Sequence, residues 1–197
     1  GSRRGAPAAH EQRLRRLKRI VADRGADAAL ITSEPDVAYL TGFLGGDSVM
    51  LVPARGKPVI LSDRRYEEDL EPFKHLATVV MRTGAMTRAI GELIRSKNYE
   101  AVLVQSEDQT LGSFGAVAAI TTKKRLVPER GLLSEMRMVK DDGEIRAIRG
   151  AIRVQEQAML ATLEVIEPGM SELEICAWLE WEMKSRGASG PAFSSWA

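Results

Sequence analysis

The sequence predicts an α/β protein in which a layered α/β domain is followed by a pair of long helices. Short apolar runs typical of buried strands alternate with amphipathic helical patterns from residue 11 to about residue 130. After residue 140 this alternation stops, and two long helical patterns follow one another. A length of 197 residues accommodates one domain and part of a second, because domains of about 150 residues are typical.

Each element of the first domain has a local signal. Residues 11–24 place Leu14, Leu17 and other apolar side chains at helical spacing among arginines and lysines. Residues 53–57 are rich in turn formers and favour a hairpin between the apolar runs on either side. The expected strands are residues 28–32, 48–52, 58–61, 78–81, 101–104 (a central strand) and 124–127. The expected helices are residues 11–24, a turn led by Pro35, 87–97 and 111–120.

The second part of the chain carries two helix-start signals. Asp141 with Glu144, and Ser171 with Glu174, have the spacing of a capping box, in which side chain and backbone cap each other. Residues 168–169 stop the first helix, the second runs to about Arg186, and residues 191–197 resemble a strand. Two such helices cannot bury a core alone in fewer than about 60 residues. We expect them to pack against a sheet from a continuation of the chain, rather than from the first domain or a partner.

Composition excludes several classes of partner. Lys and Arg total 28 against 27 Asp and Glu, so a net charge of +1 provides no field to attract nucleic acid or an anionic membrane. The single cysteine, Cys176, excludes an internal disulfide framework and fits a reducing compartment, so a cytoplasmic location is expected. No apolar run approaches the roughly 20 residues of a membrane helix.

Four stretches together resemble a known family: residues 39–43, 63–66, 137–148 and 167–172. They are similar to motifs of the pita-bread metallopeptidases, which include Xaa-Pro aminopeptidase, prolidase and creatinase. The resemblance implies three segments: a tag scar and flexible tail at residues 1–10, a creatinase/prolidase-like N-terminal domain at 11–136, and the start of a truncated pita-bread α+β catalytic domain at 137–197. Phe193 and the two serines after it fit the family pattern, whereas Trp196 and Ala197 depart from it.

The resemblance also implies an activity for a longer parent protein. That protein would hydrolyse Xaa-Pro bonds in short peptides with two divalent metal ions (Mn, Co or Zn), and it would be a homodimer. The five metal ligands of the family, two Asp, one His and two Glu, have no counterparts here. The resemblance therefore assigns this chain no catalytic residue and no metal ligand, and we expect the chain alone to be inactive.

The candidate substrate-pocket residues are Arg64, Arg65, Tyr66 and Phe193. In dimeric relatives the N-terminal domain can overhang the partner's active site, where a guanidinium could hold a peptide carboxylate and a tyrosine could narrow the pocket. The alternative for residues 64–66 is an ion pair at a strand end beside a partly buried ring. The alternative for Phe193 is a core position.

Other motifs favour structural interpretations. His10 and His75 lie far apart, and His10 falls in the expected tail. The acidic cluster at residues 67–71 is typical of a solvated helix face. Two further hypotheses for the parent protein are a catalytically inactive peptide-binding or assembly module and a creatinase-like amidinohydrolase. A nucleic-acid-binding role is the least favoured.

Overall fold

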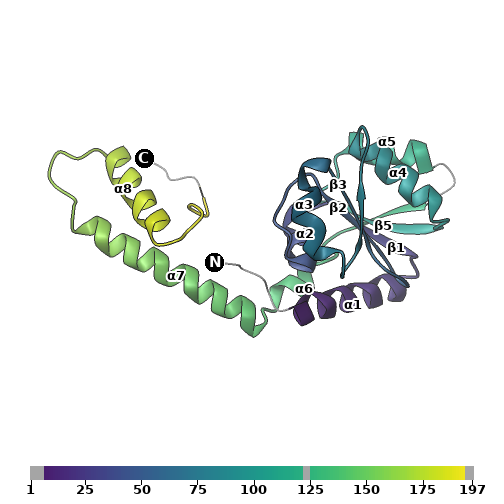
Figure 1. The fold of residues 1–197 in the computed structure, drawn as a ribbon, viewed down its shortest axis with the longest axis horizontal. Helices are drawn as coiled ribbons and strands as arrows, with labels where there is room; N and C mark the ends of the chain where they lie inside the picture. Colours follow the sequence, from purple (N-terminus) through teal and green to yellow (C-terminus); the bar gives the residue numbers. More distant parts are fainter. Residues whose placement is uncertain (1–6, 122–124, 194–197) are drawn as a thin grey trace. The chain divides into compact units, whose positions relative to one another are not determined.

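The computed structural model describes residues 7–121 and 125–193 of the chain. It consists of two compact units, one that ends at Val139 and one that begins at Lys140 (Figure 1). None of the helices in the described ranges is both long and apolar enough to cross a membrane.

Unit 1 contains a mixed six-stranded sheet with the strand order β4-β3-β2-β1-β5-β6. The β2–β3 and β1–β2 pairs are antiparallel, and the β1–β5, β5–β6 and β3–β4 pairs are parallel. The strands are β1 (Ala28–Ile31), β2 (Val49–Pro53), β3 (Val59–Ser62), β4 (Thr78–Met81), β5 (Ala101–Gln105) and β6 (Arg125–Glu129). The predicted hairpin is confirmed as β2–β3, and the strand predicted to be central, β5, has a neighbour on each side.

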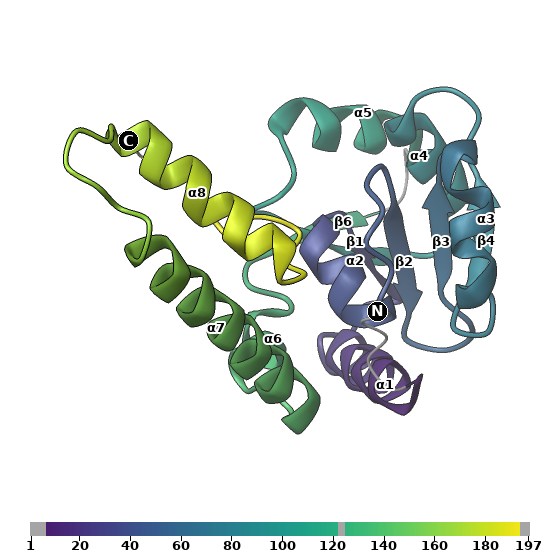
Figure 2. The same ribbon diagram turned by 60° about the vertical axis from the view of Figure 1, so that its left-hand side comes forward.

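Each face of the sheet carries a buried apolar cluster, since alternate residues of a strand point to opposite sides and helices cover both sides. Ala29 and Ile31 of β1 belong to one apolar cluster, and Ala28 and Leu30 to another. The first cluster is covered by α1 (Pro7–Asp23), α2 (Glu34–Thr41), α3 (Glu67–Leu70) and α6 (Ser134–Met138). The second is covered by α4 (Met86–Ser96) and α5 (Leu111–Thr121), which lie on the opposite side of the sheet from α1 (Figures 1 and 2). The predicted layered α/β fold is confirmed.

The N-terminal helix is longer than predicted. We expected residues 1–10 to be a flexible tail, but α1 begins at Pro7 and His10 is only 6% exposed. His10 Nδ1 lies 3.2 Å from the carbonyl oxygen of Tyr39 in α2, and its ring packs beside Gly42. This contact between distant residues holds the first turn of the helix, which the local pattern did not reveal. Residues 1–6, including the expected tag scar at Gly1 and Ser2, lie outside the described residues, as does Lys124 at the start of the last predicted strand.

Several short elements complete unit 1. The acidic cluster forms α3 and the following 3₁₀ turn η2 (Glu71–Phe73), and its carboxylates are exposed, as predicted for a solvated helix face. Another 3₁₀ turn, η1 (Arg64–Tyr66), precedes α3. The sequence pattern predicted neither η1 nor α6, because runs of three to five residues carry no measurable periodicity.

Unit 2 consists of two helices, α7 (Asp142–Leu163) and α8 (Glu172–Ser185). Both predicted capping boxes are confirmed: Asp141 accepts from the amide of Glu144, and Ser171 accepts from the amide of Glu174. The predicted strand is wrong for residues 191–193, which are not extended into a sheet, and residues 194–197 lie outside the described residues. Much of the apolar side-chain surface of both helices stays exposed, including Ile148 at 46%, Ile152 at 45% and Trp181 at 58%.

Two helical glycines provide a stability test. A Cβ at Gly91 of α4 would lie 2.7 Å from Ile120 Cβ of α5, whereas a Cβ at Gly150 of α7 would meet nothing within 4 Å. We expect Gly91→Ala to lower the free energy of unfolding by about 1–3 kcal/mol through overpacking. Gly150→Ala should raise it by up to about 1 kcal/mol through helix propensity. Urea unfolding followed by circular dichroism measures both, and a Gly91→Ala protein as stable as the parent would contradict the close α4–α5 contact.

Candidate substrate-contact site

Three of the predicted pocket residues, Arg64, Arg65 and Tyr66, form the turn η1 directly after the end of β3. Asp63 caps this turn, because its carboxylate accepts from the backbone amide of Arg65 at 3.0 Å. The same oxygen also accepts from Arg65 Nε at 3.0 Å. The cap therefore fixes both the backbone of the turn and one of its two guanidinium groups.

A network of two carboxylates and two guanidinium groups holds Arg65. Asp47, in the loop before β2, accepts from Arg65 Nη2 at 2.5 Å. Arg82, just after β4, lies 2.9 Å from Asp63 Oδ2 and 3.4 Å from Asp47 Oδ2. Arg65 is therefore paired with two protein carboxylates. The alternative interpretation of residues 64–66, an ion pair at a strand end, thus holds for Arg65. Neither Asp47 nor Arg82 was identified from the sequence, since each lies far along the chain from Arg65.

The hydrogen bonds in this network shift the ionisation of Asp63. The backbone amide of Arg65 first, then the Arg65 side chain and the charges of Arg65 and Arg82, hold the pKa of the Asp63 carboxyl below its usual range. Asp63 in turn raises the pKa of the Arg65 guanidinium through their hydrogen bond and charge attraction. Both groups are therefore charged at neutral pH.

Tyr66 belongs to an aromatic cluster. Its ring meets the Phe43 ring edge to face at a centroid distance of 5.7 Å, and Phe43 meets Phe73 in the same way at 5.7 Å. Phe43 is 4% exposed and Tyr66 is half-buried against the same core. The ring of Tyr66 therefore has the partly buried position weighed as its alternative, and Phe43 lies in the core of unit 1.

Arg64 differs from its neighbour. Its side chain is exposed, and it forms no hydrogen bond or ion pair with any of residues 7–121 or 125–193. A guanidinium without a protein partner remains able to bind a carboxylate through paired hydrogen bonds. Of the two predicted arginines, Arg64 is therefore the one whose hydrogen-bonding capacity is still available to a ligand.

Phe193, the fourth predicted residue, belongs to unit 2 and is 85% exposed. The alternative interpretation of Phe193 as a core residue therefore does not hold in this structure, where none of the described residues 140–193 buries the ring. Its assignment to a substrate pocket stays a prediction.

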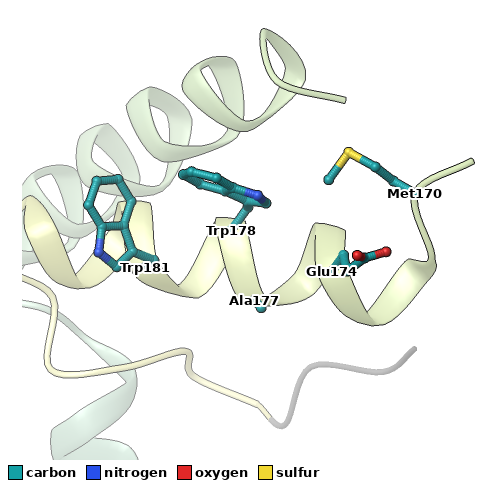
Figure 3. Close-up of a pocket in the computed structure, with 5 residues that line it drawn as sticks. All are labelled: Met170, Glu174, Ala177, Trp178 and Trp181. Atoms are coloured by element: carbon teal, nitrogen blue, oxygen red, sulfur yellow. The ribbon is translucent and has the colours of Figure 1, made fainter. Parts of the chain in front are cut away.

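Unit 2 contains an apolar groove that the sequence analysis did not identify. Met170, Glu174, Ala177, Trp178 and Trp181 line it, and Figure 3 shows the two indole rings on the same side of α8. The rings meet edge to face at 5.6 Å. Hydrogen bonds from the backbone and side chain of Ser171 lower the pKa of Glu174, so this carboxylate serves as part of the helix cap. The groove offers apolar contacts rather than acid–base chemistry.

The residues that the structure describes do not fit a metal site. Within residues 7–121 and 125–193, no three His, Cys, Asp or Glu side chains are grouped so that they could hold a metal ion. His10 is buried against Tyr39, whereas His75 is exposed, with its Nδ1 lying 2.7 Å from the carbonyl oxygen of Pro72. A metal centre therefore cannot be built from the described side chains.

Both units match known protein families, in the order in which the units follow one another along the chain. Residues 13–139 match the creatinase/prolidase N-terminal domain, and residues 146–197 match metallopeptidase family M24. The chain belongs to this creatinase and prolidase family of metallopeptidases, the pita-bread family.

Named relatives agree with this membership. The chain is 25% identical over 181 residues to the uncharacterized peptidase YqhT of Bacillus subtilis (strain 168), covering 92% of this chain and 51% of the relative. It is 24% identical over 190 residues to the Xaa-Pro dipeptidase of Pyrococcus horikoshii, covering 93% of this chain and 51% of the relative. The chain thus spans about half the length of the curated relatives it matches.

Solved structures show the same fold. An X-Pro aminopeptidase from Thermotoga maritima superimposes with a TM-score of 0.80 at 28% identity, covering 90% of this chain and 51% of that chain. The N-terminal domain of the cytoplasmic peptidase PepQ from Mycobacterium tuberculosis superimposes with a TM-score of 0.60 at 26% identity. This superposition covers 64% of this chain and 98% of that chain.

The ionisation of Asp63 tests the network. Its depressed pKa means that Asp63 stabilises the fold above its ordinary pKa of about 3.9, and that this contribution is lost as the pH falls through the folded-state value. Arg65→Gln removes a side-chain donor and a charge but keeps the backbone amide, so the pKa of Asp63 should rise part of the way toward its ordinary value. Carboxyl-carbon NMR titration measures this pKa, with Arg88→Gln on α4 as the control. An unchanged pKa in Arg65→Gln would mean that the side-chain pair is absent in solution.

Proposed function

We propose that this chain is part of a longer metal-dependent peptidase that hydrolyses Xaa-Pro bonds in short peptides. The observation that carries the proposal is the order of the two family matches, with the N-terminal domain at residues 13–139 and the metallopeptidase segment at 146–197. Relatives named Xaa-Pro dipeptidase match along about half of their own length, which supports a second half that completes the catalytic domain.

Unit 1 would serve substrate recognition and dimerisation in that protein. We assign the contact with a peptide carboxylate to Arg64, because its guanidinium is exposed and Arg65 is held by Asp47 and Asp63. Tyr66, fixed against Phe43, would narrow the pocket, and Phe193 remains a separate candidate for an apolar contact with the peptide. In a homodimer these groups of one copy would face the active site of the other.

The metal ions would be bound by residues outside the described ranges. The metallopeptidase match supports dependence on divalent metal, and we propose two ions of manganese, cobalt or zinc. The metals would supply an activated water and a polarised carbonyl. The residues described here would bind and orient the peptide. A cytoplasmic location fits the single cysteine, Cys176.

Arg64 can be tested in the longer protein. Arg64→Gln should raise the KM for an Xaa-Pro dipeptide at least about tenfold, because one charge-assisted contact is lost, while kcat changes much less. The same variant should have little effect on a substrate whose terminal carboxylate is amidated. Arg88→Gln serves as the control, because it removes an exposed guanidinium that pairs with Glu92 within α4. Equal KM values for Arg64→Gln and the parent would remove Arg64 from the pocket.

The chain of 197 residues should be inactive by itself. Purified chain, incubated with each of the three metal ions and an Xaa-Pro dipeptide, is expected to release no proline above background. The Pyrococcus horikoshii Xaa-Pro dipeptidase provides the positive control. Metal-dependent release of proline by homogeneous chain ending at Ala197 would contradict the assignment of catalysis to the rest of a longer protein.

Two alternatives concern the longer protein. Its turnover of creatine would favour the creatinase-like alternative, and the absence of any turnover by the metal-loaded protein would favour the peptide-binding module.

A further inference from the structure

Asp36 is a buried carboxylate at the start of α2 that the proposed activity does not use. It is 6% exposed, and each of its oxygens accepts a hydrogen bond from a distant residue. Gln105 Nε2, at the end of β5, donates to Oδ2 at 2.5 Å, and Arg137 Nη1, in α6, donates to Oδ1 at 2.6 Å. A buried charge persists only when it is paired and hydrogen-bonded, so these two partners are required for the position of Asp36.

Gln105 connects this carboxylate to the centre of the sheet. Its side-chain oxygen accepts from the backbone amides of Thr32 at 2.9 Å and Ser33 at 3.1 Å, directly after β1. Gln105 is 2% exposed, and its amide group is fully used between the backbone and Asp36. The carboxylate is therefore fixed by the two parallel strands β1 and β5, which are among the most buried parts of unit 1.

Met136, the residue before Arg137, is also hydrogen-bonded to α2. The Tyr39 hydroxyl of α2 donates to the carbonyl oxygen of Met136 at 3.0 Å. The carbonyl oxygen of Tyr39 accepts from Arg13 Nη1 at 2.8 Å, and the Arg13 guanidinium lies 4.2 Å from the centroid of the Tyr39 ring. Two consecutive residues of α6, Met136 and Arg137, are thus bonded to α2, and α2 is itself bonded to α1 and to the sheet.

The burial of the chain changes immediately after these tethers. Leu133 and Met136 are each 1% exposed in the core of unit 1, whereas Met138 is 69% exposed and Val139 is 73% exposed. Unit 2 begins at Lys140, one residue before the helix cap Asp141. Arg137, which pairs with the buried Asp36, stands two residues before Val139, where unit 1 ends.

We propose that the Asp36–Arg137 ion pair and the Tyr39–Met136 hydrogen bond together form a latch that fixes the end of α6 and so sets where the chain leaves unit 1. With the latch closed, Met136 and Arg137 are held against α2, and residues 138–140 lead from them to the cap of α7. With the latch open, the last turn of α6 can separate from α2, and the connection becomes longer. Arg137 is suited to such a device because its side chain is 45% exposed while that of Asp36 is 9% exposed, so the arginine can leave without unfolding the sheet. The inference does not depend on peptidase activity.

Hydrogen–deuterium exchange of the intact 197-residue chain tests the latch. Arg137→Gln removes the charge that pairs with Asp36, and we expect amide exchange in residues 134–139 to accelerate at least about tenfold, because local opening of this turn becomes easier. Exchange in α4, on the opposite face of the sheet, should remain within about twofold of the parent, as expected for a local opening. The matched control, Arg88→Gln, should leave residues 134–139 unchanged. Unchanged exchange at residues 134–139 in Arg137→Gln would overturn the proposal.

A second variant covers the case in which Arg137→Gln unfolds unit 1. Tyr39→Phe keeps the ring in its place and removes only the hydroxyl that donates to Met136. The latch predicts faster exchange in residues 134–139 for this variant, with exchange in α4 preserved. Cleavage after Lys140 by a lysine-specific protease should accelerate in the same variant. If neither exchange nor cleavage changes in Tyr39→Phe, α6 is held by its core side chains alone and the latch is refuted.

Discussion

The need to cover both faces of the sheet governs the structure of unit 1. All four residues of β1 are buried, and they alternate between the two apolar clusters, so helices must lie on each side. The small side chains Ala28 and Ala29 leave room for larger residues of the helices and neighbouring strands. At the strand ends, polar groups can meet solvent or one another. Asp63 follows β3 and Gln105 ends β5. The side chain of each accepts hydrogen bonds from backbone amides near its strand end.

Because both faces of the sheet are covered, unit 1 contains two kinds of polar cluster, one buried and one exposed. Asp36 and Gln105 are buried and fully engaged with protein partners, so they order α2, α6 and the sheet. Asp63 and Arg65 lie at an exposed strand end, where the same pairing leaves the adjacent Arg64 directed to no partner among the described residues. The first cluster is therefore a structural element, and the second offers a group that can bind a ligand.

The sequence predicted those features whose signal is local. Strand and helix periodicity identified the elements of the sheet and its main helices, and both capping boxes followed from residues three positions apart. The pairings that span the chain were not predictable. His10 contacts Tyr39, Asp36 contacts Arg137, and Asp47 contacts Arg65 only because the fold brings them together, and single-sequence periodicity carries no information on such contacts. The same reason explains why the family resemblance identified residues 64–66 as candidates but could not distinguish Arg64 from Arg65.

Unit 2 follows from the same reasoning about burial. Its two helices carry apolar faces, yet α8 has no buried residue and α7 buries only Ala158 and Thr162 among its described residues. An exposed apolar surface of this extent is typical of an element that packs against further structure. On the proposal that this chain is part of a longer protein, the rest of that protein would supply this structure.

The most direct test of this account is the nucleotide sequence of the source gene on the 3′ side of the Ala197 codon. The account predicts an open reading frame that continues for about the length of the present chain and encodes two aspartates, one histidine and two glutamates in the order of the metallopeptidase ligands. A stop codon directly after Ala197, or a continuation that lacks these ligands, would contradict the assignment of this chain to an active metallopeptidase.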